Sequence, residues 1–324
     1  MKDNFVRQVR LEEVEKVEIT TIIDNYTDRL IASSEPKTKL VTRAPLREGT
    51  TLTETPVAEH GLSLLIKLRK DNREHTILFD GGATKIGIRH NLRVLRIDLA
   101  GVEAIVLSHG HKDHYGGLGE IVKHITKEGV LLIGHPDAFL TRYREYSDGN
   151  VVKRGRLVER PLERAGVEVV KSKFPCLLAS NLLASTGEVE RLTDFEYIDP
   201  GRYIERKGKM VRDFILDDQS LVLNLKGKGL VVISGCAHSG IINSLRYTQK
   251  ITQIDRVYAV LGGFHLTGRG FEAKTERTVT ELRKIGPAVV VPMHCTSWKA
   301  MQRIYQAMPQ AFVLNSVGTK FCFD

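Results

Sequence analysis

The feature that most constrains the fold of this chain is a cluster of histidines and an aspartate directly after a short apolar run. Residues 104–108 read AIVLS, which is typical of a buried strand, and residues 109–114 read HGHKDH. Imidazole and carboxylate groups are the ligands that hold zinc, iron or manganese in proteins. At the end of a strand, the first two histidines can face one metal ion, and the aspartate and third histidine can face a second. We therefore predict one or two divalent metal ions, with zinc as the first choice and iron, manganese or magnesium as alternatives, bound by His109, His111, Asp113 and His114.

Three further histidines occupy equivalent positions, just past other apolar runs: His238, His265 and His294. Ligand sites in α/β sheets form at the carboxyl ends of the strands, so these chain segments can converge on the first cluster. We predict that His238 and His294 are metal ligands. For His265 two roles stay open, a direct ligand or a group that contacts the substrate and takes part in catalysis.

Asp80 also follows a predicted strand, within the sequence LFDGG at residues 78–82. We expect a structural role here, because an aspartate in a tight Gly-Gly turn can accept backbone N–H groups and orient the neighbouring ligand loop.

Apolar runs typical of strands recur along the chain in two sets, with helical patterns between them. Several are nearly continuous in Val, Ile and Leu, as expected for strands covered on both faces. Two such sets, each with helices outside, favour a four-layer αββα sandwich of two mixed sheets, in a single α/β domain over residues 1–324. The predicted strands are 17–24, 62–68, 76–79, 104–108, 130–134, 220–225, 230–235, 257–263, 288–292 and 311–317, and the predicted helices are 118–127, 241–250, 273–285 and 298–307.

Two segments lack this clear periodicity. Residues 138–216 are rich in Arg, Glu and Gly, and we predict an insertion that serves as a lid or a substrate wall. Residues 27–60 are polar and contain three prolines, which indicates a long loop.

The formal net charge of +9 is compatible with several partners. Most Lys and Arg residues lie among Asp and Glu, so a solvated basic surface is the first interpretation, an anionic small-molecule substrate the second and RNA the third. Only 6% of the residues are aromatic, and no basic stripe is interleaved with aromatics, which argues against nucleic acid. No apolar stretch is long enough to span a membrane, the N-terminus is charged and the four cysteines form no disulfide framework. We expect a cytoplasmic protein, whose oligomeric state stays open.

Four motifs resemble those of the metallo-β-lactamase superfamily: LFDGG at 78–82, SHGHKDH at 108–114, ISGC at 233–236 and PMHC at 292–295. Within it, GCAHSGIIN at 235–243, GGFHL at 262–266 and HCT at 294–296 resemble the 7,8-dihydropterin-6-yl-methyl-4-(β-D-ribofuranosyl)aminobenzene-5′-phosphate synthases. The resemblance implies a metallo-β-lactamase sandwich. It also implies one metal held by His109, His111 and His238 and another held by Asp113, His114 and His294.

Two positions depart from the pattern of the family. Cys236 stands where most members have a metal-bridging aspartate, so either its thiolate bridges the metals or the thiol only packs and water bridges. Ser297 replaces a glycine after the HCT motif and can reshape the wall near His294.

The resemblance implies an enzyme that acts on a phosphate-bearing small molecule. In the first interpretation this enzyme is a diphosphate-releasing transferase that condenses a dihydropterin-methyl diphosphate with a ribofuranosyl-aminobenzene phosphate. In the second it is a metallohydrolase of phosphoesters, and a nuclease is the third choice. Asp113 and His265 are the candidate catalytic residues. Asn25, His60, His265 and Lys299 are candidates for substrate contact, although His60 and Lys299 are equally compatible with an ordinary solvated surface; Arg191, Arg202 and Arg206 are weaker candidates for binding an anion.

Overall fold

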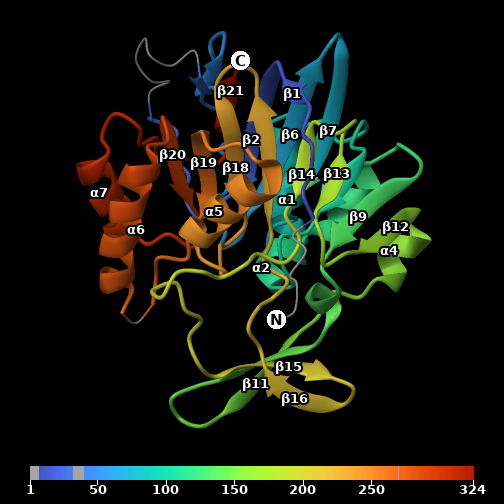
Figure 1. Cartoon of the computed structure of the whole chain (residues 1–324). Helices are drawn as coiled ribbons and strands as arrows, with labels where there is room; N and C mark the ends of the chain where they lie inside the picture. The colour runs from blue at the N-terminus through green and yellow to red at the C-terminus, as the bar shows by residue number, and fades with distance from the viewer. Residues whose placement is uncertain (1–6, 32–39, 269) are drawn as a thin grey trace.

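In the computed structural model of the chain, which describes residues 7–31, 40–268 and 270–324, two mixed β-sheets pack face to face between two layers of helices (Figure 1). The predicted α/β class and the four-layer sandwich are confirmed. The eight-stranded sheet has the order β12-β9-β8-β7-β6-β2-β21-β3, and the seven-stranded sheet has the order β13-β14-β17-β18-β19-β20, with β1 also paired to β17.

The strands of the eight-stranded sheet are β2 (Lys16–Ile23), β3 (Val41–Thr42), β6 (Ser63–Lys70), β7 (Arg73–Phe79), β8 (Ala104–Val106), β9 (Val130–Gly134), β12 (Val167–Lys171) and β21 (Lys320–Phe323). Those of the seven-stranded sheet are β1 (Glu13–Val14), β13 (Cys176–Leu178), β14 (Leu183–Ser185), β17 (Ser220–Leu225), β18 (Gly229–Ser234), β19 (Val257–Gly263) and β20 (Val289–Met293). A hairpin of β4 (Arg47–Glu48) and β5 (Thr51–Leu52) stands apart from both sheets.

The helices are α1 (Lys85–Val94), α2 (Lys112–Tyr115), α3 (Leu118–Ile121), α4 (Arg160–Arg164), α5 (Ile241–Thr252), α6 (Phe271–Ile285) and α7 (Trp298–Ala307), with short 3-10 turns at Val122–His124 and Pro136–Phe139. Helix α7 begins where the Ser297 hydroxyl accepts a hydrogen bond from the Ala300 N–H, the usual way in which a serine caps a helix.

Three apolar clusters explain the layering. The central one joins residues from both sheets, such as Ile66 and Phe79 of one and Leu223 and Val231 of the other. A second joins the seven-stranded sheet to α5, α6 and α7, and a third joins the eight-stranded sheet to α1, α3 and α4. Because both faces of strands such as β8, β9, β18 and β20 are covered, their sequences are nearly continuously apolar instead of alternating.

Two predictions about elements are wrong. Residues 311–317 form no strand: only Phe312 makes a bridge, with Val290, and the chain then turns toward the other sheet, where Asn315 accepts a hydrogen bond from Thr21. The helix predicted over 118–127 ends at Ile121 and gives way to a 3-10 turn.

The range 138–216 divides between different parts of the fold. Strands β12, β13 and β14 extend the two main sheets, whereas β10 (Arg142–Glu145), β11 (Val151–Gly155), β15 (Arg202–Arg206) and β16 (Lys209–Arg212) form a separate four-stranded antiparallel sheet, here called the small sheet. Figure 1 shows the small sheet below the ends of the main sheets. Its role as a lid or substrate wall stays a prediction. The predicted loop 27–60 includes β3, β4 and β5, and its residues 32–39 lie outside the described part of the chain.

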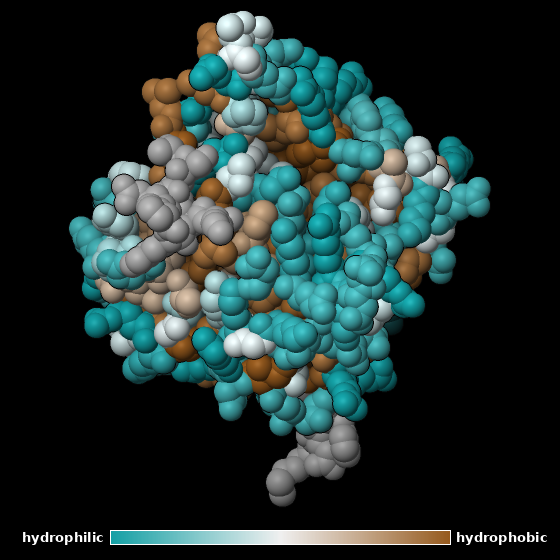
Figure 2. Space-filling model, turned by 90° about the horizontal axis from the view of Figure 1, so that it is seen from above, coloured by the Kyte–Doolittle hydropathy of each residue, from teal (hydrophilic) through white to brown (hydrophobic). Residues whose placement is uncertain are grey.

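Within the described residues, no helix is both long enough and apolar enough to cross a membrane. Figure 2 shows the face seen from above, which hydrophilic residues largely cover.

Candidate metal centre

The carboxyl ends of five strands meet at the edge of the sandwich that faces the small sheet. Strands β7 and β8 end at Asp80 and at the Ser108–His114 loop, and β18, β19 and β20 end at His238, His265 and His294. Four residues that follow these strands, Asp80, Ala237, His265 and His294, have a positive φ, between 47° and 61°. Such backbone conformations cost energy for residues other than glycine and cluster at functional sites, where the surrounding structure fixes them.

The first triad consists of His109, His111 and His238. The Nδ1 atom of His111 lies 2.8 Å from His109 Nε2 and 3.1 Å from His238 Nε2. One candidate ligand atom from each residue lies within 4.8 Å of the other two. Zinc–nitrogen bonds of about 2.0–2.1 Å in tetrahedral geometry place ligand nitrogens about 3.3 Å apart. The triad therefore fits one divalent ion.

The second triad consists of Asp113, His114 and His294. The His294 Nε2 atom lies 3.2 Å from His114 Nε2 and 3.3 Å from Asp113 Oδ2, and Asp113 Oδ2 lies 3.8 Å from His114 Nε2. These distances also fit one ion. The two sets are the same as those that the family resemblance implies, and their role as ligands is a proposal that we test below.

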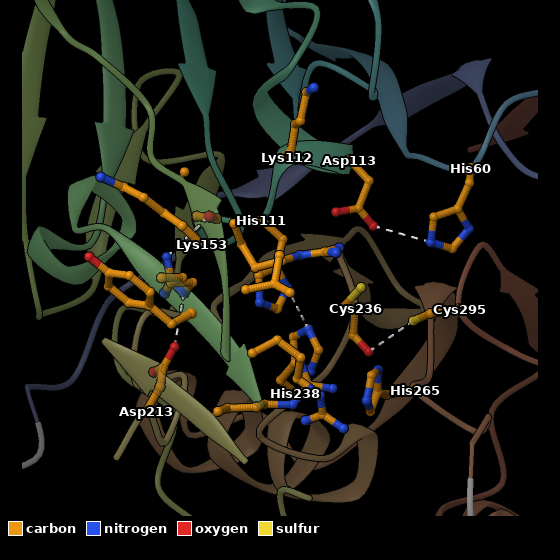
Figure 3. A pocket seen from close by; sticks show the side chains of 18 of the residues that line it. His60, His111, Lys112, Asp113, Lys153, Asp213, Cys236, His238, His265 and Cys295 are labelled. Atoms are coloured by element: carbon orange, nitrogen blue, oxygen red, sulfur yellow. Dashed lines mark hydrogen bonds and ion pairs between the residues drawn. The ribbon is translucent and has the colours of Figure 1, made fainter. Parts of the chain in front are cut away.

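Two cysteine thiols lie beside the triads. Cys236 Sγ is 3.2 Å from His114 Nε2 and falls in one group with His109 and His114, so it lies between the two triads. Cys295 donates a hydrogen bond of 3.3 Å to the Cys236 carbonyl, as Figure 3 shows. A bridging role for the Cys236 thiolate is thus compatible with its position.

The ring nitrogens that face away from the triads are held by neighbouring groups. His114 Nδ1 lies 2.6 Å from Asp80 Oδ2, His294 Nδ1 lies 3.0 Å from Asn25 Oδ1, and His109 Nδ1 lies 2.9 Å from Ser108 Oγ. Metal-binding histidines usually have such a partner, which fixes the ring so that the opposite nitrogen faces the ion. The arrangement of donors therefore fits a metal centre.

Burial lowers the pKa of His109, His111 and His238, and positively charged neighbours lower it further. These imidazoles are thus neutral, which is the form that binds a metal. For His114, burial lowers the pKa, but the Asp80 carboxylate outweighs this and raises it to about 9. Metal binding at the second triad therefore displaces a proton from His114.

Four buried aspartates hold the ligand loops by accepting backbone N–H groups. Asp80 accepts from Ser108 at 2.7 Å, Asp24 from His294 at 2.8 Å and Asp218 from Ser239 at 2.9 Å. Asp217 accepts from Gly110, between the two histidines of the first triad, at 2.7 Å. The predicted partners of Asp80 were the N–H groups of the Gly81-Gly82 turn, whereas its carboxylate contacts the Ser108 N–H and the His114 ring. Its role in orienting the ligand loop stays a prediction.

Sequence reasoning did not identify the buried Arg142, which lies behind the first triad. Its guanidinium donates to Asp213 Oδ2 at 3.0 Å, to Asp217 Oδ1 at 2.5 Å and to the Gly110 carbonyl at 3.1 Å. Together Arg142 and Asp217 hold both backbone groups of Gly110. Nothing in the sequence indicated that Asp217 would pair with Arg142.

A glycine lets the two sheets approach each other at this point. A Cβ atom on Gly235 would lie 2.1 Å from Ser108 Oγ and 3.0 Å from Asp80 Oδ2. Because Ser108 and Asp80 belong to the other sheet, any larger residue here would push the two halves of the centre apart.

Both triads open into one cavity of about 540 Å³, which the small sheet closes on one side. Asp113, His111 and His238 line it from the main sheets, as do His60, His265 and Cys236 (Figure 3). The small sheet forms the opposite wall and contributes five cationic side chains to the lining: Arg142, which is paired with Asp213 and Asp217, and Arg144, Lys153, Arg154 and Arg202.

Some of the residues predicted to contact the substrate line this cavity, and others do not. His60 lines it, 3.5 Å from Asp113 Oδ2, and Asn25 donates to His60 Nδ1 at 3.1 Å, whereas His265 packs its ring 4.1 Å from that of His238. Lys299 is exposed in the first turn of α7 and is not among the lining residues.

Of the three arginines considered as anion contacts, only Arg202 lines the cavity. Arg191 donates to the carbonyls of Phe214 and Ile215, and Arg206 pairs with Asp137.

Comparison with known proteins agrees with this fold. A model of the metallo-β-lactamase superfamily matches residues 57–175. The chain is 33% identical over 264 residues, covering 79% of this chain and 87% of the relative, to the 7,8-dihydropterin-6-methyl-4-(β-D-ribofuranosyl)-aminobenzene-5′-phosphate synthase of Methanocaldococcus jannaschii. It is 35% identical to an uncharacterized protein of the same organism, covering 81% of this chain and 92% of that one.

Among solved structures, the chain is similar to one described as a metal-dependent hydrolase of the β-lactamase superfamily. The TM-score is 0.69, with 24% identity, covering 94% of this chain and 98% of the other. At this identity the likeness shows the fold alone.

Proposed function

The chain belongs to the metallo-β-lactamase superfamily, and from this premise we propose that it is a metal-dependent transferase that releases diphosphate. Its substrates in this proposal are a dihydropterin-methyl diphosphate and a ribofuranosyl-aminobenzene phosphate. The relative that is 33% identical over most of its length carries the name of a synthase for the corresponding product.

The observation that carries the proposal is that two triads with the spacing of metal ligands and a cationic wall face each other across one cavity. The Arg202 guanidinium is half-buried in this wall, and no described residue accepts a hydrogen bond from it or forms an ion pair with it. An arginine held out of water without a partner is a ready site for phosphate oxygens, because its planar fork of N–H donors matches them.

The reaction breaks the bond between the methylene carbon and the diphosphate oxygen, and the diphosphate leaves with the electron pair. The amino nitrogen of the second substrate forms the new bond to that carbon and loses a proton. Divalent ions in such a centre act as Lewis acids that stabilise negative charge on phosphate oxygens. The wall residues Arg202, Arg144 and Lys153 hold the remaining phosphate charge.

His265 is the side chain that we assign to accept the proton, because it lines the cavity and belongs to neither triad, although one of its ring nitrogens also lies within 4.8 Å of ligand atoms of Cys236 and His238. Asp113, within the second triad, orients the reacting groups next to His60. The small sheet screens the cavity from water, which would otherwise compete with the amine for the methylene carbon.

The test is to incubate metal-loaded protein with both substrates and to measure diphosphate release and the joined product by mass spectrometry. We expect product only when both substrates are present, and a fall in turnover of about tenfold or more for Arg202→Ala, from the lost contacts to phosphate. A matched control is Lys299→Ala, an exposed cation outside the cavity, whose turnover should be unchanged.

Diphosphate release at the same rate without the second substrate, or hydrolysis of simple phosphoesters in its place, would identify a metallohydrolase. Protein that binds no zinc, iron, manganese or magnesium on reconstitution would contradict the metal centre itself.

A further inference from the structure

A second cavity adjoins the metal centre on the side away from the small sheet. It measures about 340 Å³, and it shares His60, His294, Cys295 and Thr267 with the first cavity. His294 therefore separates the two: its Nε2 atom faces the second triad, and its Nδ1 atom is held by Asn25, which lines the second cavity. The two cavities also adjoin each other at His60 and Thr267.

The chemistry of the second cavity is opposite to that of the first. Its remaining walls are largely apolar or aromatic, formed by Tyr26, Pro292, Trp298, Met301 and Leu314. Its described lining includes no lysine or arginine. The one carboxylate, that of Asp24, already accepts hydrogen bonds from the N–H groups of Asn25 and His294 and from the Asn315 amide. The cavity therefore suits an uncharged group.

Trp298 gives this cavity its specificity. It is the one tryptophan in the sequence, and 66% of its surface is exposed although it stands beside a hollow. Its backbone is held in place, because the preceding Ser297 caps α7 and donates its N–H to the Leu266 carbonyl at 3.0 Å. A large rigid indole held at the edge of an apolar cavity is an arrangement that binds flat rings by stacking.

We propose that this cavity, which we call the Trp298 cavity, binds a flat, uncharged aromatic ring of the substrate while the metal centre and the cationic wall hold its phosphate. This inference rests on the proposed function and adds the place where the ring binds. The ring and the phosphate of the substrate then lie on opposite sides of His294, and the group that links them lies next to the second triad.

The test uses the intrinsic fluorescence of the single tryptophan. Metal-free and metal-loaded protein are titrated with pterin and with 4-aminobenzyl alcohol, the two ring types that the proposed reaction joins, and with cyclohexylmethanol as a saturated control. We expect saturable quenching by at least one aromatic ring in both forms of the protein, and none by cyclohexylmethanol. The ring that binds identifies which substrate the cavity takes.

Calorimetry on variants then locates the site. Trp298→Ala should weaken ring binding by about tenfold or more, Trp298→Phe should retain most of it, and Met301→Lys should abolish it while keeping the tryptophan. Tyr305→Ala, which removes another exposed aromatic of α7, is the control and should bind as the wild type does.

The proposal is overturned if neither ring quenches in either form of the protein, or if Trp298→Ala and Met301→Lys both bind the ring normally. Because ring binding is measured without metal or turnover, this failure is distinct from a failure of the transferase assay, which would leave ring binding intact.

Discussion

The ligand loops and the small sheet face each other across one cavity, but different interactions hold them. On the side of the loops, backbone N–H groups are held by four buried aspartates. One of them, Asp217, also forms a buried ion pair with Arg142, the first residue of the small sheet. On the side of the small sheet, Lys153 and Arg154 are exposed, and every residue of β16 is exposed. The difference indicates that one side fixes the geometry of the metals, whereas the other can vary to suit a substrate.

We expect the largest effect from Asp80→Ala. This change removes the acceptor of the Ser108 N–H and the partner of His114, both fully buried. Leaving such groups without a partner costs about 3 kcal/mol or more, and the second triad should lose its metal. Urea denaturation and elemental analysis measure the two effects.

The matched control for this change is Asp98→Ala, because Asp98 also accepts a backbone N–H, from Ala100, but is exposed. Its stability should fall by less than about 1 kcal/mol. Full metal content in Asp80→Ala would contradict the role that we give to the buried aspartates.

A smaller effect should follow from Arg142→Met, which breaks the contacts to Asp213, Asp217 and the Gly110 carbonyl. We expect the affinity of the first triad for metal to fall by roughly 10- to 100-fold, the usual cost of losing a group that orients ligands. Competition with a coloured chelator measures the affinity. Arg93→Met, which breaks an exposed pair with Glu54, should leave it unchanged.

Cys236→Asp tests the position between the triads. A carboxylate is a harder ligand than a thiolate, so we expect binding to be retained and the preference for zinc over manganese to fall by about tenfold if Cys236 bridges the metals. Metal titrations with both ions measure the preference. An unchanged preference would show that the thiol only packs against His114.

The smallest effect belongs to the small sheet. In the double variant Lys153→Ala with Arg154→Ala, two cations leave the wall of the cavity. We expect KM for a phosphate-bearing substrate to rise by about fivefold and metal content to stay the same, because exposed cations contribute through weak, screened attraction. Lys209→Ala, on β16 outside the cavity, is the control, and lost metal in the double variant would contradict the division between the two regions.

The sequence by itself determined the features of this protein that depend on residues close together in the chain. The segments that carry the candidate ligands follow apolar runs, and strands such as β9, β17 and β19 lie where their continuous Val, Ile and Leu residues predicted them. The family resemblance paired His109 with His238 and Asp113 with His294, and the distances agree with that pairing.

Tertiary structure alone decided what depends on distant segments meeting. Asp217 and Arg142 are 75 residues apart in the chain. The sequence does not indicate that they form a buried pair, because an arginine and an aspartate that form an exposed ion pair would look the same in the sequence. The wrong strand prediction for residues 311–317 also reflects contacts between distant segments. The apolar side chains of this segment are needed for packing, but its backbone turns away after one bridge to Val290. Local pattern determines which residues must be buried and which can bind metal, whereas only the folded chain determines which charges face a common cavity.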